Sequence, residues 1–133
     1  MIFIDSGAII ARYIVSDDKH CLSLSFWAKL EKDSLPLVTS SLVLAESITY
    51  LSRRMGNYFA VQRIQAIYQS RAFRVLRPEE EDELLALSLM EKYADQKVGF
   101  TDCVSFVLMK RERIKRVFTF DRHFEYAGFT VVP

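Results

Sequence analysis

The sequence predicts an α/β fold: a three-layer α/β/α sandwich with a central, mostly parallel five-stranded sheet. Two observations lead to this prediction. Short apolar segments alternate along the chain with longer stretches of helical periodicity, and strands separated by helices need crossover connections, which make a sheet parallel and cover both of its faces. Two of the apolar segments, one near each end of the chain, also stop at an aspartate. Open α/β sheets bind ligands at the carboxyl ends of their strands.

Local patterns place the individual elements. The clearest helix follows Ser40 or Ser41, either of which can cap it, and carries an apolar stripe at helical spacing from Leu44 until Gly56 stops it. Pro78 suits a first helical position, and the acidic residues after it suit a helix N-terminus. Strands are expected at residues 2–4, 37–39, 73–76, 116–120 and 130–132. Helices are expected at residues 7–13, 19–31, 41–55, 58–70, 78–94, from about 101 onward and, as a short turn, at 121–126.

Length and composition narrow the class of protein. The 133 residues predict one domain over 1–133, with 50% hydrophobic and 26% charged residues, as in globular chains. The net charge of +1 gives no overall attraction to nucleic acid, so any such attraction must be local. Two cysteines and no signal peptide indicate reduced thiols in a cytoplasmic protein. No stretch is apolar enough to predict a membrane span.

The carboxylates at strand ends are the strongest functional signal. Asp5 and Asp121 each follow an apolar strand and precede a helix, so each alone is explained at least as well by a helix cap or an Asx turn. Together at one edge of a sheet they repel each other unless a cation lies between them, which makes a shared metal site about as well supported as two caps. Asp102, at the start of an apolar helix, extends the pair to a trio. Glu46, by contrast, reads as a solvated charge on the polar face of its helix.

The chain resembles the PIN-domain family, of the kind represented by VapC-type toxins. The most specific stretch is Thr119-Phe120-Asp121-Arg122-His123-Phe124. Residues 93–95, 100–109 and 127–129 fit the same pattern, as does the start, Ile4-Asp5-Ser6-Gly7-Ala8. The resemblance covers essentially the whole chain.

The resemblance implies a metal-dependent endoribonuclease, with Mg²⁺ or Mn²⁺ held by four acids. By position these acids are Asp5, Glu46, Asp102 and Asp121, so the family pattern promotes Glu46 where its own surroundings do not. Oxygen ligands suit such hard cations, and no His or Cys cluster indicates zinc. Candidate supporting groups are Ser6, Thr119 and, less clearly, Asp95, which also reads as a helix-terminal residue.

RNA, an antitoxin protein and a second copy of the chain are the partners that the resemblance implies. Candidate cations for RNA are Arg12, Arg53 and Arg54 near the acids, and Lys110 and Arg111 in the densest basic run, which a solvated helix C-terminus also explains. The helices at residues 41–70 carry more apolar residues than one core-facing stripe needs, so they predict either partner docking or a thick core. Two alternatives stay open: a PIN-like nucleic-acid-binding module without activity and, less well supported, a phosphoacceptor signalling domain.

Overall fold

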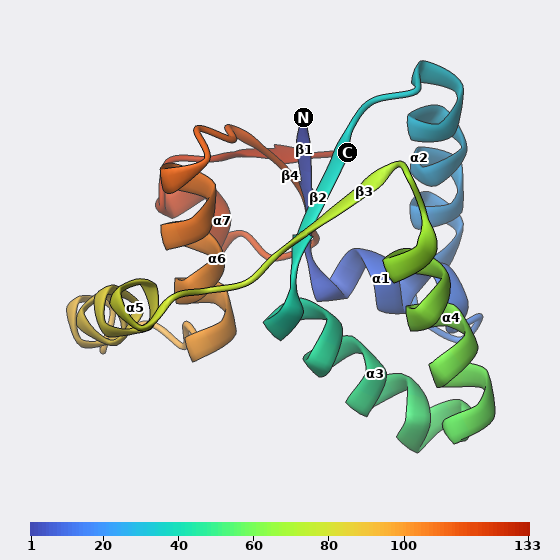
Figure 1. Cartoon of the computed structure of the whole chain (residues 1–133), viewed down its shortest axis with the longest axis horizontal. Coiled ribbons are helices and arrows are strands. Elements are labelled where there is room, and N and C mark those ends of the chain that lie inside the picture. The colour runs from blue at the N-terminus through green and yellow to red at the C-terminus, as the bar shows by residue number, and fades with distance from the viewer.

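Five strands and seven helices alternate along the chain (Figure 1). The structure is a computed structural model that describes residues 1–133. It confirms the predicted α/β class and the number of strands. The elements are β1 (Ile2–Ile4), α1 (Ser6–Tyr13), α2 (His20–Asp33), β2 (Leu37–Ser40), α3 (Ser41–Met55), α4 (Asn57–Gln69), β3 (Phe73–Leu76), α5 (Glu80–Lys92), α6 (Phe100–Arg111), β4 (Arg116–Phe118), α7 (His123–Tyr126) and β5 (Thr130–Val132).

All neighbouring strands are parallel, in the order β3-β2-β1-β4-β5. Phe3 in the central strand pairs with Val38 on one side and Val117 on the other. The chain adds β2 and β3 on one side of β1 and then returns to add β4 and β5 on the other. The order therefore reverses between β1 and β4, and in open α/β sheets this is where ligands bind, outside the carboxyl ends of the strands.

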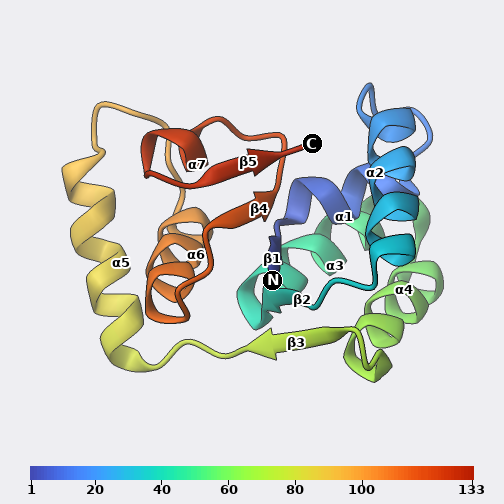
Figure 2. The ribbon, with the colours of Figure 1, turned by 90° about the horizontal axis from the view of Figure 1, so that it is seen from above.

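Helices cover both faces of the sheet, as predicted (Figure 2). Helices α5, α6 and α7 lie on one side, while α1, α2 and α4 lie on the other. Helix α3 runs outward from the carboxyl end of β2 and packs against α4 (Figure 1). None of the helices combines the length and the apolar character that crossing a membrane requires.

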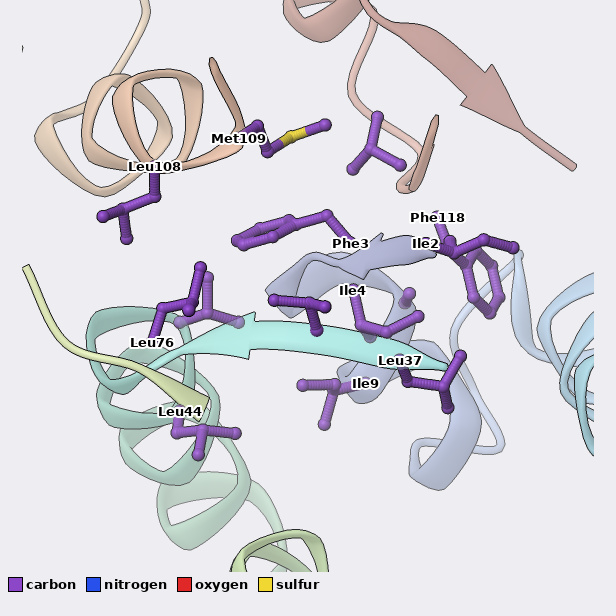
Figure 3. Packing of buried hydrophobic residues seen from close by; sticks show 14 of the residues in the cluster. Ile2, Phe3, Ile4, Ile9, Leu37, Leu44, Leu76, Leu108, Met109 and Phe118 are labelled. Carbon is purple, nitrogen blue, oxygen red and sulfur yellow. The ribbon is translucent and has the colours of Figure 1, made fainter. Parts of the chain in front are cut away.

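The core lies on both faces of the central strand. Ile2, Phe3 and Ile4 have no exposed surface, and a strand buried on both faces is apolar at every position rather than alternating. Phe3 points toward Leu108 and Met109 of α6, while Ile4 lies on the opposite side of β1 (Figure 3). This packing fixes the end of β1, so the residue that follows has a defined position.

Several predicted boundaries were wrong, and side-chain hydrogen bonds explain the main ones. Strand β4 ends at Phe118 rather than at residue 120, because the Thr119 hydroxyl accepts a hydrogen bond from the backbone N–H of Asp121 and turns the chain. Helix α7 begins at His123 rather than 121, because the Asp121 carboxylate accepts from the His123 N–H. Helix α5 spans Glu80–Lys92 rather than 78–94, because the carboxylate of Asp82 accepts from the N–H of Glu79 and sets the first turn there. The predicted bounds at residues 2–4, 41–55, 73–76 and 130–132 are confirmed, and the remaining ends differ by at most two residues.

Candidate active site

A cavity of about 370 Å³ opens at the reversal point of the sheet. All four acids that the family resemblance picked out line it, although they come from four different parts of the chain. Its complete lining is Asp5, Ser6, Gly7, Glu46, Gly99, Phe100, Thr101, Asp102, Thr119, Phe120 and Asp121.

Each acid is positioned by the start or end of a regular element. Asp5 directly follows β1, and Asp121 follows the Thr119 turn after β4. Asp102 lies in the first turn of α6. Glu46 lies on α3, whose N-terminus is fixed after β2 by the Ser40 hydroxyl, which accepts from the N–H of Val43. Because β1, β2 and β4 are parallel neighbours, their carboxyl ends bring these residues to one edge.

Asp5 is the most deeply buried of the four, at 4% exposure. Its side chain makes no capping hydrogen bond to α1, so the cap explanation fails for this residue. Oδ2 accepts a hydrogen bond of 2.7 Å from the Thr119 hydroxyl, while Oδ1 is buried without any partner. The pKa of Asp5 is raised to about 7: burial is the largest cause, the neighbouring charges of Asp102 and Glu46 also raise it, and hydrogen bonds from the Thr119 hydroxyl and the Ser6 backbone lower it.

Asp102 shares this electrostatic environment. Burial is the largest cause that raises its pKa, to about 6, and the charges of Asp121 and Glu46 add to it. A backbone hydrogen bond from Gly99 and the nearby His123 act in the opposite direction. Two carboxyl groups with raised pKa values in one cavity are typical of a functional site.

Short hydrogen bonds hold the other two acids. The hydroxyl of Ser6 donates to Oε1 of Glu46, across 40 positions of sequence. Asp121 Oδ1 accepts from the backbone N–H of His123 at 2.9 Å and lies 2.8 Å from the Nδ1 atom of the same residue, although that ring nitrogen lacks the angle of a hydrogen bond. Asp121 therefore forms an Asx turn and also lines the cavity.

The donor set fits a hard divalent cation. Only carboxylate and hydroxyl oxygens converge from the side chains of the four acids, Ser6 and Thr119, and the unpartnered Oδ1 of Asp5 is a buried acceptor with nothing to neutralise it. As they stand, no three acidic, His or Cys side chains are close enough to enclose an ion. Carboxylates repel one another when no cation lies between them. Mg²⁺ also keeps several of its waters and needs few direct protein ligands, so the wide spacing of the four acids is compatible with a Mg²⁺ site in this cavity.

The candidate RNA-binding cations separate clearly. Arg53 lines a cavity next to the acids, on the same face of α3 as Glu46. Arg12 pairs with Glu31 at 3.2 Å and stacks over Trp27, and Arg54 bonds to Tyr50 and Ser16. Lys110 and Arg111 lie at the far end of α6 from Asp102, and neither lines the acidic cavity. Arg111 pairs with Asp82 and with Glu112.

Sequence reasoning also missed parts of the site. Asp95 is exposed between α5 and α6 and does not line the cavity. Its position therefore does not favour a role in orienting the four acids. Five lining residues were not chosen as site residues: Gly7, Gly99, Phe100, Thr101 and Phe120. Their closeness in sequence to Asp5, Asp102 and Asp121 was the available signal.

Comparison with known proteins gives the family. The profile of the PIN domain family matches residues 2–129, and the chain belongs to that family. Among characterised proteins, the 23S rRNA-specific endonuclease VapC20 of Mycobacterium tuberculosis is 32% identical over 133 residues, which cover 99% of this chain and 98% of VapC20. The chain is thus a homologue of the VapC-like endoribonuclease toxins, which confirms the resemblance noted in its motifs.

Solved structures agree with the family. The crystal structure of M. tuberculosis VapC20, described as a sarcin-ricin loop cleaving toxin, matches with a TM-score of 0.88 and 30% identity, covering 98% of this chain and 97% of that one. FitAcB from Neisseria gonorrhoeae matches with a TM-score of 0.70 over 100% of this chain and 97% of its own. At 17% identity the second match supports the fold alone.

Proposed function

We propose that this chain is a metal-dependent endoribonuclease that hydrolyses RNA phosphodiesters and is the toxin of a VapBC-type toxin–antitoxin pair. One observation carries the proposal. Oδ1 of Asp5 is buried without a partner in a cavity that three further carboxylates line. Such an arrangement is costly in a protein that holds no cation there.

Each residue has a distinct part in the proposed reaction. Asp5, Asp102 and Asp121 would hold Mg²⁺ or Mn²⁺, directly or through bound waters, and Glu46, fixed by Ser6, would orient the attacking water or reach the cation through a water. Thr119 keeps the Asp5 carboxylate turned toward the cavity. A bound divalent cation supplies Lewis-acid chemistry, because it polarises the scissile phosphate and lowers the pKa of a coordinated water.

Protonation limits this site at low pH. Asp5 and Asp102, with pKa values of about 7 and about 6, hold protons that compete with the cation. Activity at a fixed, low metal concentration is therefore expected to rise from pH 5 to pH 8. Saturating metal shifts the rise toward lower pH, because binding favours the ionised carboxylates.

A protein partner is part of the proposal. The VapC20 relative is described as a toxin. By analogy we expect this chain to be cytoplasmic, to pair with an antitoxin protein and to form a homodimer. Val61 and Tyr68 of α4 are about half exposed while Ile64 and Ile67 of the same helix are buried. The excess apolar residues of this region thus serve both the core and an exposed face that a partner helix would cover.

The decisive experiment is RNA cleavage by the purified protein with Mg²⁺ or Mn²⁺. We expect cleavage that EDTA stops and that Asp5→Asn or Asp102→Asn abolishes, with a loss of at least about a thousandfold in rate because these groups hold the charge that neutralises the reaction centre. Asp18→Asn, an exposed carboxylate far from the cavity in sequence, is the matched control. Equal cleavage by the active-site variants would assign the activity to a contaminating nuclease. RNA affinity without any metal-dependent cleavage would instead identify an inactive binding module.

A further inference from the structure

A second, shallower cavity of about 440 Å³ adjoins the acidic one. Glu46 and Thr101 line both cavities, so the two form one continuous depression. From Glu46 it follows the outward face of α3, where Tyr50 and Arg53 form its farther wall. We call this depression the α3 groove.

Tyr50 is anchored at its hydroxyl and remains partly exposed, with the Arg54 guanidinium over its ring at 5.8 Å from the centroid. Arg54 donates one hydrogen bond of 3.1 Å to the Tyr50 hydroxyl and another of 3.2 Å to the hydroxyl of Ser16, in the loop between α1 and α2. The residue is nevertheless 39% exposed and lines the groove. An aromatic ring that is already anchored loses little conformational entropy when a ligand binds, and its exposed face offers a surface for stacking.

Arg53 supplies a free positive charge in the same groove. It is exposed, and it forms neither a hydrogen bond nor an ion pair. It lies seven positions after Glu46 on the same face of α3, which is about 10 Å along the helix axis. Four carboxylates beside the groove repel a phosphate backbone, so a nearby unpaired cation is the feature that would let such a backbone approach.

We propose that the α3 groove binds a single-stranded RNA nucleotide next to the scissile phosphate, with its base stacked on Tyr50 and a backbone phosphate at Arg53. This inference rests on the proposed nuclease function, because it names where the substrate continues beyond the acids. A docking protein helix fits less well, since beside Leu42 and Ala45 the groove is lined by Glu46, Thr49, Tyr50, Arg53 and Thr101, which do not make a continuous apolar stripe. The base must be unstacked to reach Tyr50, so loops and single strands bind and a duplex does not.

The first test measures binding in an Asp102→Asn background, which is expected not to cleave. A short, fluorescently labelled single-stranded RNA of mixed sequence is titrated in Mg²⁺ by anisotropy. Tyr50→Leu is expected to weaken binding about 5- to 100-fold, the range that one lost stacking contact gives, while Tyr50→Phe keeps most of the affinity. Tyr58→Leu, an exposed tyrosine on α4, is the matched control and is expected to bind as the parent does.

The second test separates the phosphate contact from the stacking contact. Arg53→Gln is expected to lower the slope of log affinity against log salt by about 0.7, the value for one phosphate contact with a single strand. Tyr50→Leu is expected to leave that slope unchanged. Arg116→Gln, at the start of β4 and thus at the opposite edge of the sheet, is the control for removing one exposed positive charge.

The outcomes distinguish this inference from the proposed function. If the wild-type chain cleaves RNA and the Tyr50 and Arg53 variants match their controls in affinity, in salt dependence and in KM, the α3 groove is not a substrate site although the nuclease assignment stands. If the wild-type chain cleaves nothing, the nuclease proposal fails, and unchanged binding by the variants then overturns the groove as well. A raised KM with little change in kcat for Tyr50→Leu, restored by Tyr50→Phe, supports it.

Discussion

Thr119 joins the two strand ends that make the site. Its hydroxyl donates to Oδ2 of Asp5 and accepts from the backbone N–H of Asp121, so one oxygen orients two of the four acids. Strand propensity alone explains a threonine at this position, and the family pattern was the reason to choose it. The hydrogen bonds give it a physical role that no local pattern contains, because Asp5 lies 114 positions away.

Thr119→Val tests this role at nearly constant side-chain shape. Loss of the hydrogen bond that lowers the pKa of Asp5 is expected to raise that pKa above about 7 and to move the acid limb of the pH–rate profile to higher pH. At neutral pH the rate is expected to fall about tenfold or more, since hydrogen bonds to charged groups contribute roughly 1.5–3 kcal/mol. A pH–rate profile at fixed Mn²⁺ is the measurement. Thr119→Ser restores the profile, and Thr130→Val on β5 leaves it unchanged; an unshifted acid limb in Thr119→Val would show that the hydroxyl does not tune Asp5.

Glu46 marks the limit of residue-level reasoning. On α3 it is an exposed acid on a polar face, and nothing nearby in sequence separates it from an ordinary solvated charge. Its partner, the Ser6 hydroxyl, lies at the start of α1, 40 positions earlier in the chain. The same limit applies to Arg111. The sequence made it a candidate for RNA binding, but in the fold it bonds to Asp82, which lies 29 positions earlier.

Asp82 contributes both to the start of α5 and to its contact with α6. The Asp82 carboxylate accepts from the N–H of Glu79 at 2.8 Å, which fixes the helix start, and it also pairs with Arg111 of α6. One side chain thus sets both where α5 begins and how it is tied to its neighbour. The acidic run around it was correctly interpreted as structural, since it fills the first turn.

Asp82→Ala is expected to lower the free energy of unfolding by about 1–3 kcal/mol, because it removes a helix-start hydrogen bond and leaves Arg111 with only its longer ion pair to Glu112. Urea denaturation followed by circular dichroism measures the change. Glu80→Ala, an exposed acid in the same turn, is expected to cost much less. Equal losses in the two variants would mean that only charge near the helix N-terminus matters.

Element types follow from sequence more reliably than element ends. The buried runs of β1 and β4 and the apolar stripe of α3 come from residues close together, so their classes were predicted correctly. The ends at Phe118, Glu80 and His123 depend on which side chain accepts which backbone N–H. Residues Thr119, Asp82 and Asp121 each have several such options, and only the folded arrangement selects one.

For the whole molecule, the cavity makes metal-free stability depend on pH. The pKa of Asp5 rises from 3.8 to about 7 on folding, and that of Asp102 rises to about 6. The folded chain therefore keeps protons that the unfolded chain releases between about pH 4 and pH 7. The stabilisation is complete below pH 4 and is lost as the pH rises through these folded-state values, so the free energy of unfolding falls across this range.

Asp5→Asn is expected to stabilise the metal-free protein at pH 8 by about 1–4 kcal/mol, because it removes a buried charge, while it abolishes activity. Thermal melting in EDTA at pH 5 and pH 8 measures the effect, which is expected to be small at pH 5. Added Mn²⁺ is expected to raise the melting temperature of the wild type much more than that of the variant. Asp18→Asn controls for the change in net charge, and a variant no more stable than wild type at pH 8 would mean that Asp5 is not desolvated.

The pairing of β1 with β4 has a consequence for protein synthesis. Asp5 is synthesised before the Thr119 hydroxyl that orients it, because Thr119 lies 114 positions later in the chain. Between them β2 and β3 can already pair on the other side of β1, so a large part of the sheet can form while the acidic cavity still lacks a wall. A nascent chain that has not yet exposed β4 therefore carries an incomplete site, and the cavity closes only after β4 and Thr119 have emerged and β4 has docked.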